Sequence, residues 1–143
     1  HPESDAVFAE RLALFPAGCL VLEAGGRPAG YAIAHPWNRR RPPALDTLLG
    51  GLPAAPGAFY LHDLAILPPA RGGGAGAAAV LALAGMAGEL PMALVAIGGT
   101  EGFWRAQGFA TVPDPALDAV LRCYDAGARY MERAVTPPGG RGR

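Results

Sequence analysis

Residues 60–76 read YLHDLAILPPARGGGAG, and this stretch decides the expected fold. An apolar strand, predicted over Phe59–Leu67, passes through a proline turn into a run of glycines, and the composition from there to about Gly88 is helical. Unpaired amides at a helix N-terminus attract anions, and glycine lets a diphosphate approach the backbone. With Arg71 beside the turn, the stretch predicts a cradle for a pyrophosphate. A purely structural glycine turn is the alternative.

The elements on either side of this stretch alternate between helix and strand. Before this stretch we expect a helix after Ser4, a hairpin of strands Cys19–Ala24 and Ala29–His35, and a long loop over 36–58 with a short helix near 44–49. After it we expect a strand over Met92–Ile97, a helix from Thr100 through Gln107, a strand near 109–112, a helix over 115–122 and a strand over about 128–135. This order predicts one mixed α/β domain with a central sheet over residues 1–135. The tail, 136–143, is expected to be disordered.

Composition excludes several classes of function. The 143 residues are 51% hydrophobic, and 12 basic residues balance 12 acidic ones. A neutral chain has no overall field that would concentrate nucleic acid or an anionic membrane. The two cysteines form no CxxC pair, which argues against structural zinc, and no apolar run approaches the ~20 residues of a membrane span. With no signal peptide, we expect a cytoplasmic protein with free thiols and no metal.

Two motifs resemble those of the GNAT superfamily of N-acetyltransferases. Arg71-Gly72-Gly73-Gly74-Ala75-Gly76 is similar to the family's R/Q-x-x-G-x-G/A motif, and Leu64-Ala65-Ile66-Leu67-Pro68 is similar to the strand end that precedes it. Gly102–Phe109 resembles the second motif, a short helix that ends in "GF". The resemblance implies a mixed sheet, flanked by helices, whose fourth and fifth strands splay apart. The family's first strand is expected to be missing in part.

The resemblance also implies a site for acetyl-CoA between the splayed strands. Backbone groups of Leu64 and Ile66 would meet the pantetheine and the thioester, and an N–H near Ile66 would polarise the acetyl carbonyl. Arg71 and the amides of residues 72–77 would hold the pyrophosphate, and two aromatic side chains would pack beside the coenzyme. The implied residues are Leu64, Ala65, Ile66, Arg71, Gly72, Gly73, Gly74, Ala75, Gly76, Ala77, Phe103 and Trp104.

Acetyl transfer needs a neutral amine, so a base must remove a proton from the ammonium. His62 is the best candidate because imidazole exchanges a proton near neutral pH. If no bulge intervenes, Tyr60, His62 and Leu64 share one face of the strand, and Asp63 points to the other. The stretch 61–66 is similar to that of aralkylamine N-acetyltransferases, whose histidines on this strand act through water. A histidine packed in the sheet is the alternative.

The proton donor and the acceptor site are less defined. The family commonly has a tyrosine where this chain has Trp104, so Tyr124, or less favourably Tyr130, would protonate the leaving thiolate, unless no acid is needed. Trp37 and Tyr60 are the candidate acceptor contacts, although Trp37 serves equally well as a loop anchor. The loop over 36–58 is expected to cover an acceptor that is a small-molecule or peptide amine. Domains of this family often form dimers, so the resemblance implies a homodimer.

Other functions remain as alternatives. Gly72-x-Gly74-x-x-Ala77 fits the loose dinucleotide-binding pattern, but its glycines do not directly follow the strand, and no acid ends Met92–Ile97. No GK[ST] follows the glycines, which excludes a P-loop hydrolase. A catalytically silent domain of the GNAT fold that binds acyl-CoA or another protein is the more serious alternative. The length of the acyl group is left open.

Overall fold

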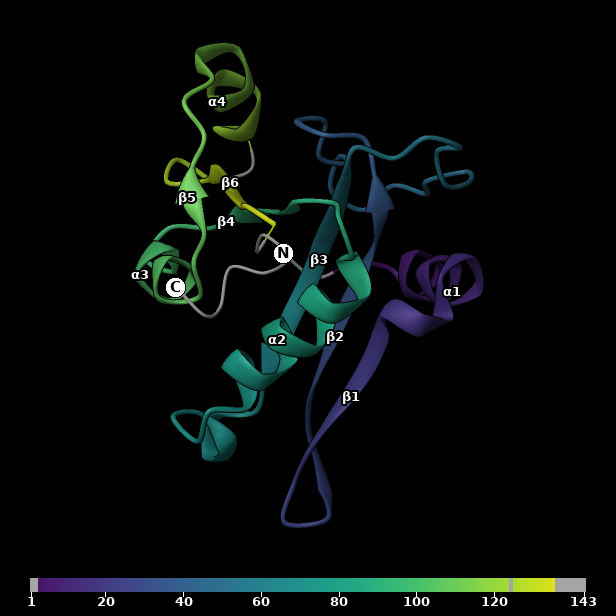
Figure 1. Ribbon diagram of the computed structural model, residues 1–143, viewed down its shortest axis with the longest axis vertical. Helices are drawn as coiled ribbons and strands as arrows, with labels where there is room; N and C mark the ends of the chain where they lie inside the picture. The colour runs from purple at the N-terminus through teal and green to yellow at the C-terminus, as the bar shows by residue number, and fades with distance from the viewer. Residues whose placement is uncertain (1–2, 124, 136–143) are drawn as a thin grey trace, which may run out of the picture.

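The computed structural model describes residues 3–123 and 125–135 and has a six-stranded mixed sheet with the order β1-β2-β3-β4-β6-β5 (Figure 1). The single mixed α/β domain is as predicted. The helices are α1 (Asp5–Leu14), α2 (Ala75–Ala87), α3 (Glu101–Ala106) and α4 (Pro115–Leu121), with short 3-10 turns at Pro16–Gly18 and Pro68–Ala70. The strands are β1 (Cys19–Ala24), β2 (Arg27–Trp37), β3 (Ala58–Ile66), β4 (Met92–Ala96), β5 (Ala110–Thr111) and β6 (Arg129–Arg133).

Local sequence explains most element boundaries. Gly25 and Gly26 form the two-residue turn of the β1–β2 hairpin with φ of 60° and 76°, which a tight hairpin turn requires. The short helix predicted near 44–49 is wrong, because the described loop between β2 and β3 contains no helix. Asp46 there has φ of 51°, in the left-handed region that interrupts a right-handed helix.

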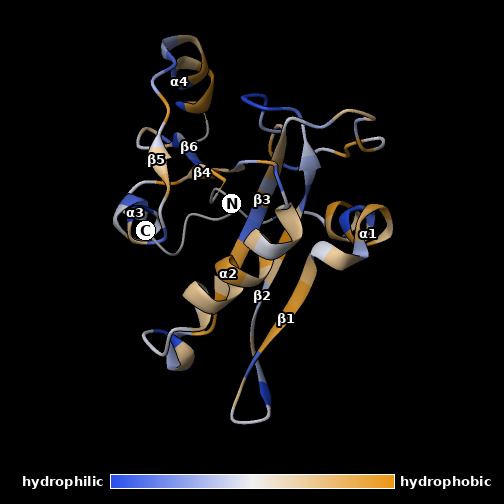
Figure 2. Cartoon of the chain, viewed as in Figure 1, coloured by the Kyte–Doolittle hydropathy of each residue, from blue (hydrophilic) through white to orange (hydrophobic). Residues whose placement is uncertain are grey.

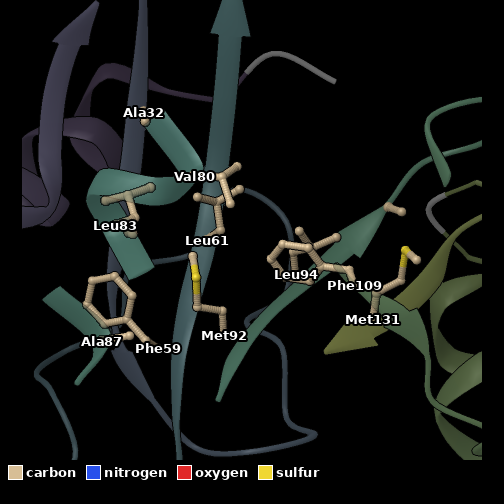
Figure 3. Packing of buried hydrophobic residues seen from close by; sticks show 12 residues of the cluster. Ala32, Phe59, Leu61, Val80, Leu83, Ala87, Met92, Leu94, Phe109 and Met131 are labelled. Atoms are coloured by element: carbon tan, nitrogen blue, oxygen red, sulfur yellow. The ribbon is translucent and has the colours of Figure 1, made fainter. Parts of the chain in front are cut away.

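The sheet separates two apolar clusters. The first lies against α2 and contains Phe59, Leu61 and Leu83 together with residues of β4 and β6. Figure 3 shows Leu61 close to Val80 of α2. The second, on the opposite face, contains Tyr60 and residues of α4 and β6. Adjacent β3 residues therefore enter different clusters, as the alternation of a strand requires. In Figure 2 the middle of β3 is polar between apolar ends.

A β-bulge changes this alternation in the middle of β3. On β2, Ile33 is opposite Asp63 and Ala34 is opposite Leu61, so His62 is the extra residue. The expectation that Tyr60, His62 and Leu64 share one face is therefore wrong. Leu64 packs with the α2 cluster and Tyr60 with the other. Asp63 is correspondingly on the Tyr60 face rather than opposite to it.

β3 and β4 separate soon after they begin. They pair only at Phe59 with Met92 and at Tyr60 with Ala93, while β3 continues to Ile66 along β2 (Figure 1). These strands flank the glycine turn and α2, so they are the pair that the family resemblance predicts to splay. From Leu61 onward, the edge of β3 that faces β4 is not used for strand pairing.

Candidate active site

The glycine turn after β3 creates a helix N-terminus with free backbone donors. Gly72 and Gly74 have φ of 83° and 84°, a conformation that favours glycine, and Gly74 is the N-cap of α2. The first bond of the helix joins the Ala78 amide to the Gly74 carbonyl at 3.0 Å. The amides of residues 75–77 thus precede the helical hydrogen bonds, and the first turn has no acidic residue. Such an end suits an anion.

Arg71 and Phe103 flank this helix end. The Arg71 Nε donates to the Ile66 carbonyl at 2.9 Å, which holds the guanidinium beside the end of β3. A Cβ on Gly76 would lie 2.9 Å from Phe103 Cζ and 3.2 Å from Ile66 Cδ1. Glycine at this position therefore lets the start of α2, the end of β3 and α3 approach one another. Phe103 is 41% exposed and lies next to the start of α2.

Trp104 has a different environment from its neighbour. Its ring packs edge-on against Phe109 at 5.6 Å between centroids and contacts the α2 cluster. The indole therefore fixes α3 to the core. Contact of Trp104 with a coenzyme stays a prediction, and Phe103 is the more exposed of the two aromatic residues.

A pocket of about 190 Å³ lies between β3, the end of β4, the loop residues 43–45 and the turn before β6. Tyr60 and His62 line it, so the structure brings these two predicted residues together. Its lining also includes apolar Leu45, Val95 and Ile97 and the carboxylates of Glu3, Asp63 and Asp125, with no lysine or arginine. A neutral chain thus has a locally acidic pocket beside the splayed strands.

His62 is paired with a carboxylate that no sequence motif indicated. Its Nε2 lies 2.6 Å from Glu3 Oε1, and each side chain is 8% exposed. Glu3 Oε2 accepts from the Asp46 amide at 2.9 Å, and Asp46 Oδ1 accepts from the Ser4 amide at 2.7 Å. The residues of the pair are 59 positions apart, so only the tertiary structure reveals the contact.

A second histidine lies deeper beside His62. His35 on β2 is 1% exposed, and its ring centroid lies 6.4 Å from that of His62 and 5.7 Å from that of Tyr60. Burial lowers the pKa of His35 to about 4, although the Pro36 carbonyl, 2.9 Å from Nδ1, acts in the opposite direction. His35 is therefore neutral near pH 7. No sequence motif indicates His35, because its burial follows from its place in β2, an inner strand of the sheet.

This burial predicts an acid-sensitive fold. Because the pKa of His35 in the folded state lies below that of unfolded histidine, about 6.5, the unfolded chain binds the proton first. The stability that neutral, buried His35 gives the fold is fully present above about pH 6.5. As the pH falls toward 4, the free energy of unfolding decreases by about 3 kcal/mol through this residue. Urea denaturation across this range measures it.

The His35→Asn variant is the control for this prediction. Its amide nitrogen can replace Nδ1 as the donor to the Pro36 carbonyl, but asparagine does not titrate. Carboxylates titrate in both proteins, so their contribution cancels in the difference. We expect a flatter pH profile for His35→Asn, and equal slopes for both proteins between pH 6.5 and 4 would contradict the assignment.

The remaining predicted residues fall elsewhere. Trp37 donates its indole N–H to the Arg41 carbonyl at 2.8 Å, so it anchors the turn after β2, and the pocket lining does not include it. Tyr124 lies outside the described residues. Tyr130 is buried, and its hydroxyl donates to Glu132 at 2.9 Å and accepts from the Arg40 amide. Burial, with the charge of Glu132, raises the pKa of Tyr130, which makes it a poor acid.

This arrangement is a mixed α/β fold in which a strand with an unpaired edge leads, through a glycine turn, to a helix N-terminus. A family model described as the acetyltransferase (GNAT) family matches residues 1–109. The chain therefore belongs to the GNAT acetyltransferase family, whose fold binds acyl-CoA. No curated protein sequence matches it.

Solved structures with the same fold have low sequence identity to the chain. Ard1 from Thermoplasma volcanium has a TM-score of 0.67 at 14% identity, over 96% of this chain and 83% of that one. Chaetomium thermophilum Naa20, in complex with a bisubstrate analogue, has a TM-score of 0.68 at 14% identity, over 99% and 78%. The Bacillus subtilis N-acetyltransferase YlbP, in complex with coenzyme A, has a TM-score of 0.55 at 19% identity, over 82% and 67%.

Two further observations concern the described residues alone. None of their helices has both the length and the apolar character needed to cross a membrane. Within the same residues, no group of three or more His, Cys, Asp or Glu side chains is placed to hold a metal ion.

Proposed function

We propose that the protein transfers the acetyl group of acetyl-CoA to a primary amine by direct attack within a ternary complex. The observation that carries this proposal is the continuity of β3. The strand leads from the acidic pocket at His62 along an unpaired edge to the glycine turn. One extended ligand can thus meet the helix N-terminus at one end and the pocket at the other. The bisubstrate analogue bound to Naa20 supports simultaneous binding in this fold.

The residues at the turn fit the anionic end of the coenzyme. Left-handed glycines, amides that precede the helical bonds and the guanidinium of Arg71 would hold the pyrophosphate. The free edge of β3 at Leu64 and Ile66 would hydrogen-bond the pantetheine like an added strand. A backbone N–H near Ile66 would stabilise the charge that develops on the carbonyl oxygen.

The pocket would bind the acceptor and prepare it for attack. An alkylammonium resembles lysine, with a pKa of ~10.4, so it arrives protonated. The carboxylates of Asp63 and Asp125 favour this cation over an acceptor with an anionic group beside the amine. His62 would then take the proton, directly or through water, and the neutral amine would attack the thioester.

The leaving group need not have a dedicated acid. A thiol with a pKa near that of cysteine, about 8.5, is an adequate leaving group as the unprotonated thiolate. Tyr124 stays a predicted proton donor. The engaged hydroxyl of Tyr130 is less suited to this role.

Calorimetry of acetyl-CoA binding tests the coenzyme site. We expect micromolar-range binding, roughly −7 to −8 kcal/mol, by the wild type. In Arg71→Ala/Gly74→Glu, binding should be lost, because the variant removes the guanidinium and places a carboxylate at the helix N-terminus. NAD and ATP should not bind.

Arg27→Ala/Gly85→Glu is the matched control. It makes the same change in net charge at exposed positions, in the β1–β2 hairpin and late in α2, and should bind as the wild type does. Folded wild-type protein that binds no acyl-CoA would overturn the proposal, and binding of NAD instead would favour a dinucleotide site. Acetyl-CoA binding without turnover on an amine panel would favour the catalytically silent alternative.

A further inference from the structure

The contact between His62 and Glu3 determines which ring nitrogen has the proton. Glu3 Oε1 lies 2.6 Å from His62 Nε2, and an ionised carboxylate can only accept hydrogen bonds. Nε2 must therefore be the donor. In a neutral imidazole only one nitrogen has a hydrogen, so the lone pair is on Nδ1.

Glu3 is itself held in place by the loop that lines the pocket. Its second oxygen, Oε2, accepts from the Asp46 amide at 2.9 Å, and Asp46 in return accepts from the Ser4 amide at 2.7 Å. This reciprocal pair holds Asp46 at a φ of 51°, which a non-glycine residue rarely adopts. One carboxylate thus connects His62 to the loop whose residues 43–45 form a wall of the pocket.

The loop has two further attachments to α1. The Glu10 carboxylate accepts from the Leu49 amide at 2.6 Å and from the Gly50 amide at 2.9 Å. The buried Arg11 donates to the Thr47 carbonyl at 3.1 Å. These bonds fix the loop independently of Glu3, so loss of the Glu3 side chain should release His62 without detaching the whole loop.

We propose that Glu3 is the positioning residue of the proposed transferase, fixing His62 in the Nε2–H tautomer so that Nδ1 is the atom that takes the proton from the acceptor. The inference rests on the proposed function of the pocket. The proton leaves the ammonium for Nδ1, which gives a neutral amine and an imidazolium whose Nε2–H still donates to Glu3. The imidazolium later releases the same proton from Nδ1 to solvent.

Nitrogen NMR of the His62 ring tests the tautomer without requiring turnover. The ring signals of ¹⁵N-histidine-labelled protein would be assigned by their loss in His62→Gln. For the neutral ring we expect a protonated Nε2 and a bare Nδ1 in the wild type and in Glu3→Gln, whose amide oxygen can still accept. In Glu3→Ala we expect a mixture of tautomers. A wild-type ring protonated at Nδ1, or no change in Glu3→Ala, would overturn the proposal.

Kinetics separate positioning from folding. Glu3→Ala should lower kcat by about 10- to 100-fold, the range seen when a metal-binding histidine loses the carboxylate that orients it, with acetyl-CoA affinity unchanged. Glu3→Gln should restore part of kcat. Asp5→Asn, at an exposed acid two positions along, is the control and should behave as the wild type. Wild-type kcat in Glu3→Ala would overturn the role of Glu3, whereas wild-type protein that binds acetyl-CoA and acetylates no amine would contradict the proposed function.

Discussion

Replacing His62 by glutamine should lower kcat by about 10²- to 10⁴-fold, the range that general base catalysis contributes, and leave acetyl-CoA affinity unchanged. Glutamine can still donate from its amide to Glu3, so the pocket keeps its hydrogen bond, but it cannot take a proton. The measurement is the release of coenzyme A thiol with an acceptor found by screening amines.

The pH dependence of this defect separates a base from a packing residue. A base is needed only while the acceptor is an ammonium, so the difference between wild type and His62→Gln should shrink as the pH approaches the amine pKa of ~10.4. Tyr31→Phe is a useful control, since it removes the 2.8 Å hydrogen bond to Asp63 on the same face of the sheet but leaves His62 intact. A defect in His62→Gln that stays constant with pH would contradict the role of a base.

The parts of the site that sequence could predict are those set by neighbours in the chain. The end of β3, the glycine turn and the start of α2 lie within residues 58–87, and a strand, left-handed glycines and an alanine-rich helix follow from local chemistry. The two-motif pattern then indicated the family and the splayed pair. The helix predicted after Ser4 begins at Asp5 although the Ser4 side chain makes no capping hydrogen bond, since helix stability depends on packing as well as on caps.

The parts that sequence missed depend on distant contacts. The bulge at His62 is set by the register between β2 and β3, and no residue type in the stretch 60–66 indicates it. It moved Asp63 to the Tyr60 face and Leu64 to the α2 face. The net charge of zero also gave no indication of the pocket, whose lining contains three carboxylates and no lysine or arginine. Glu3 reaches His62 only because α1 and the loop at Asp46 bring them together.

Replacing Gly30 by alanine should destabilise the protein by about 3 kcal/mol and weaken acetyl-CoA binding at least about tenfold, because the clash is with backbone rather than with a mobile side chain. Gly30 on β2 is opposite Ile66 at the end of β3. An added Cβ would overlap the Ala65 carbonyl oxygen and lie 3.0 Å from Ile66 Cα. No rotamer change relieves this contact, so the strands must separate where β3 is proposed to meet the pantetheine. Urea denaturation and calorimetry on the folded variant measure the two effects.

Gly85→Ala is the matched control, with the same added methyl group in a different setting. Gly85 is exposed within α2, and a Cβ there meets nothing within 4 Å. Alanine should stabilise the helix by about 1 kcal/mol and leave acetyl-CoA binding unchanged. If Gly30→Ala unfolds at the same urea concentration as Gly85→Ala, the close approach of β2 and β3 is not required. If it is destabilised but binds acetyl-CoA with wild-type affinity, the end of β3 does not pair with the coenzyme, because a displaced edge cannot keep the spacing that strand-like hydrogen bonds need.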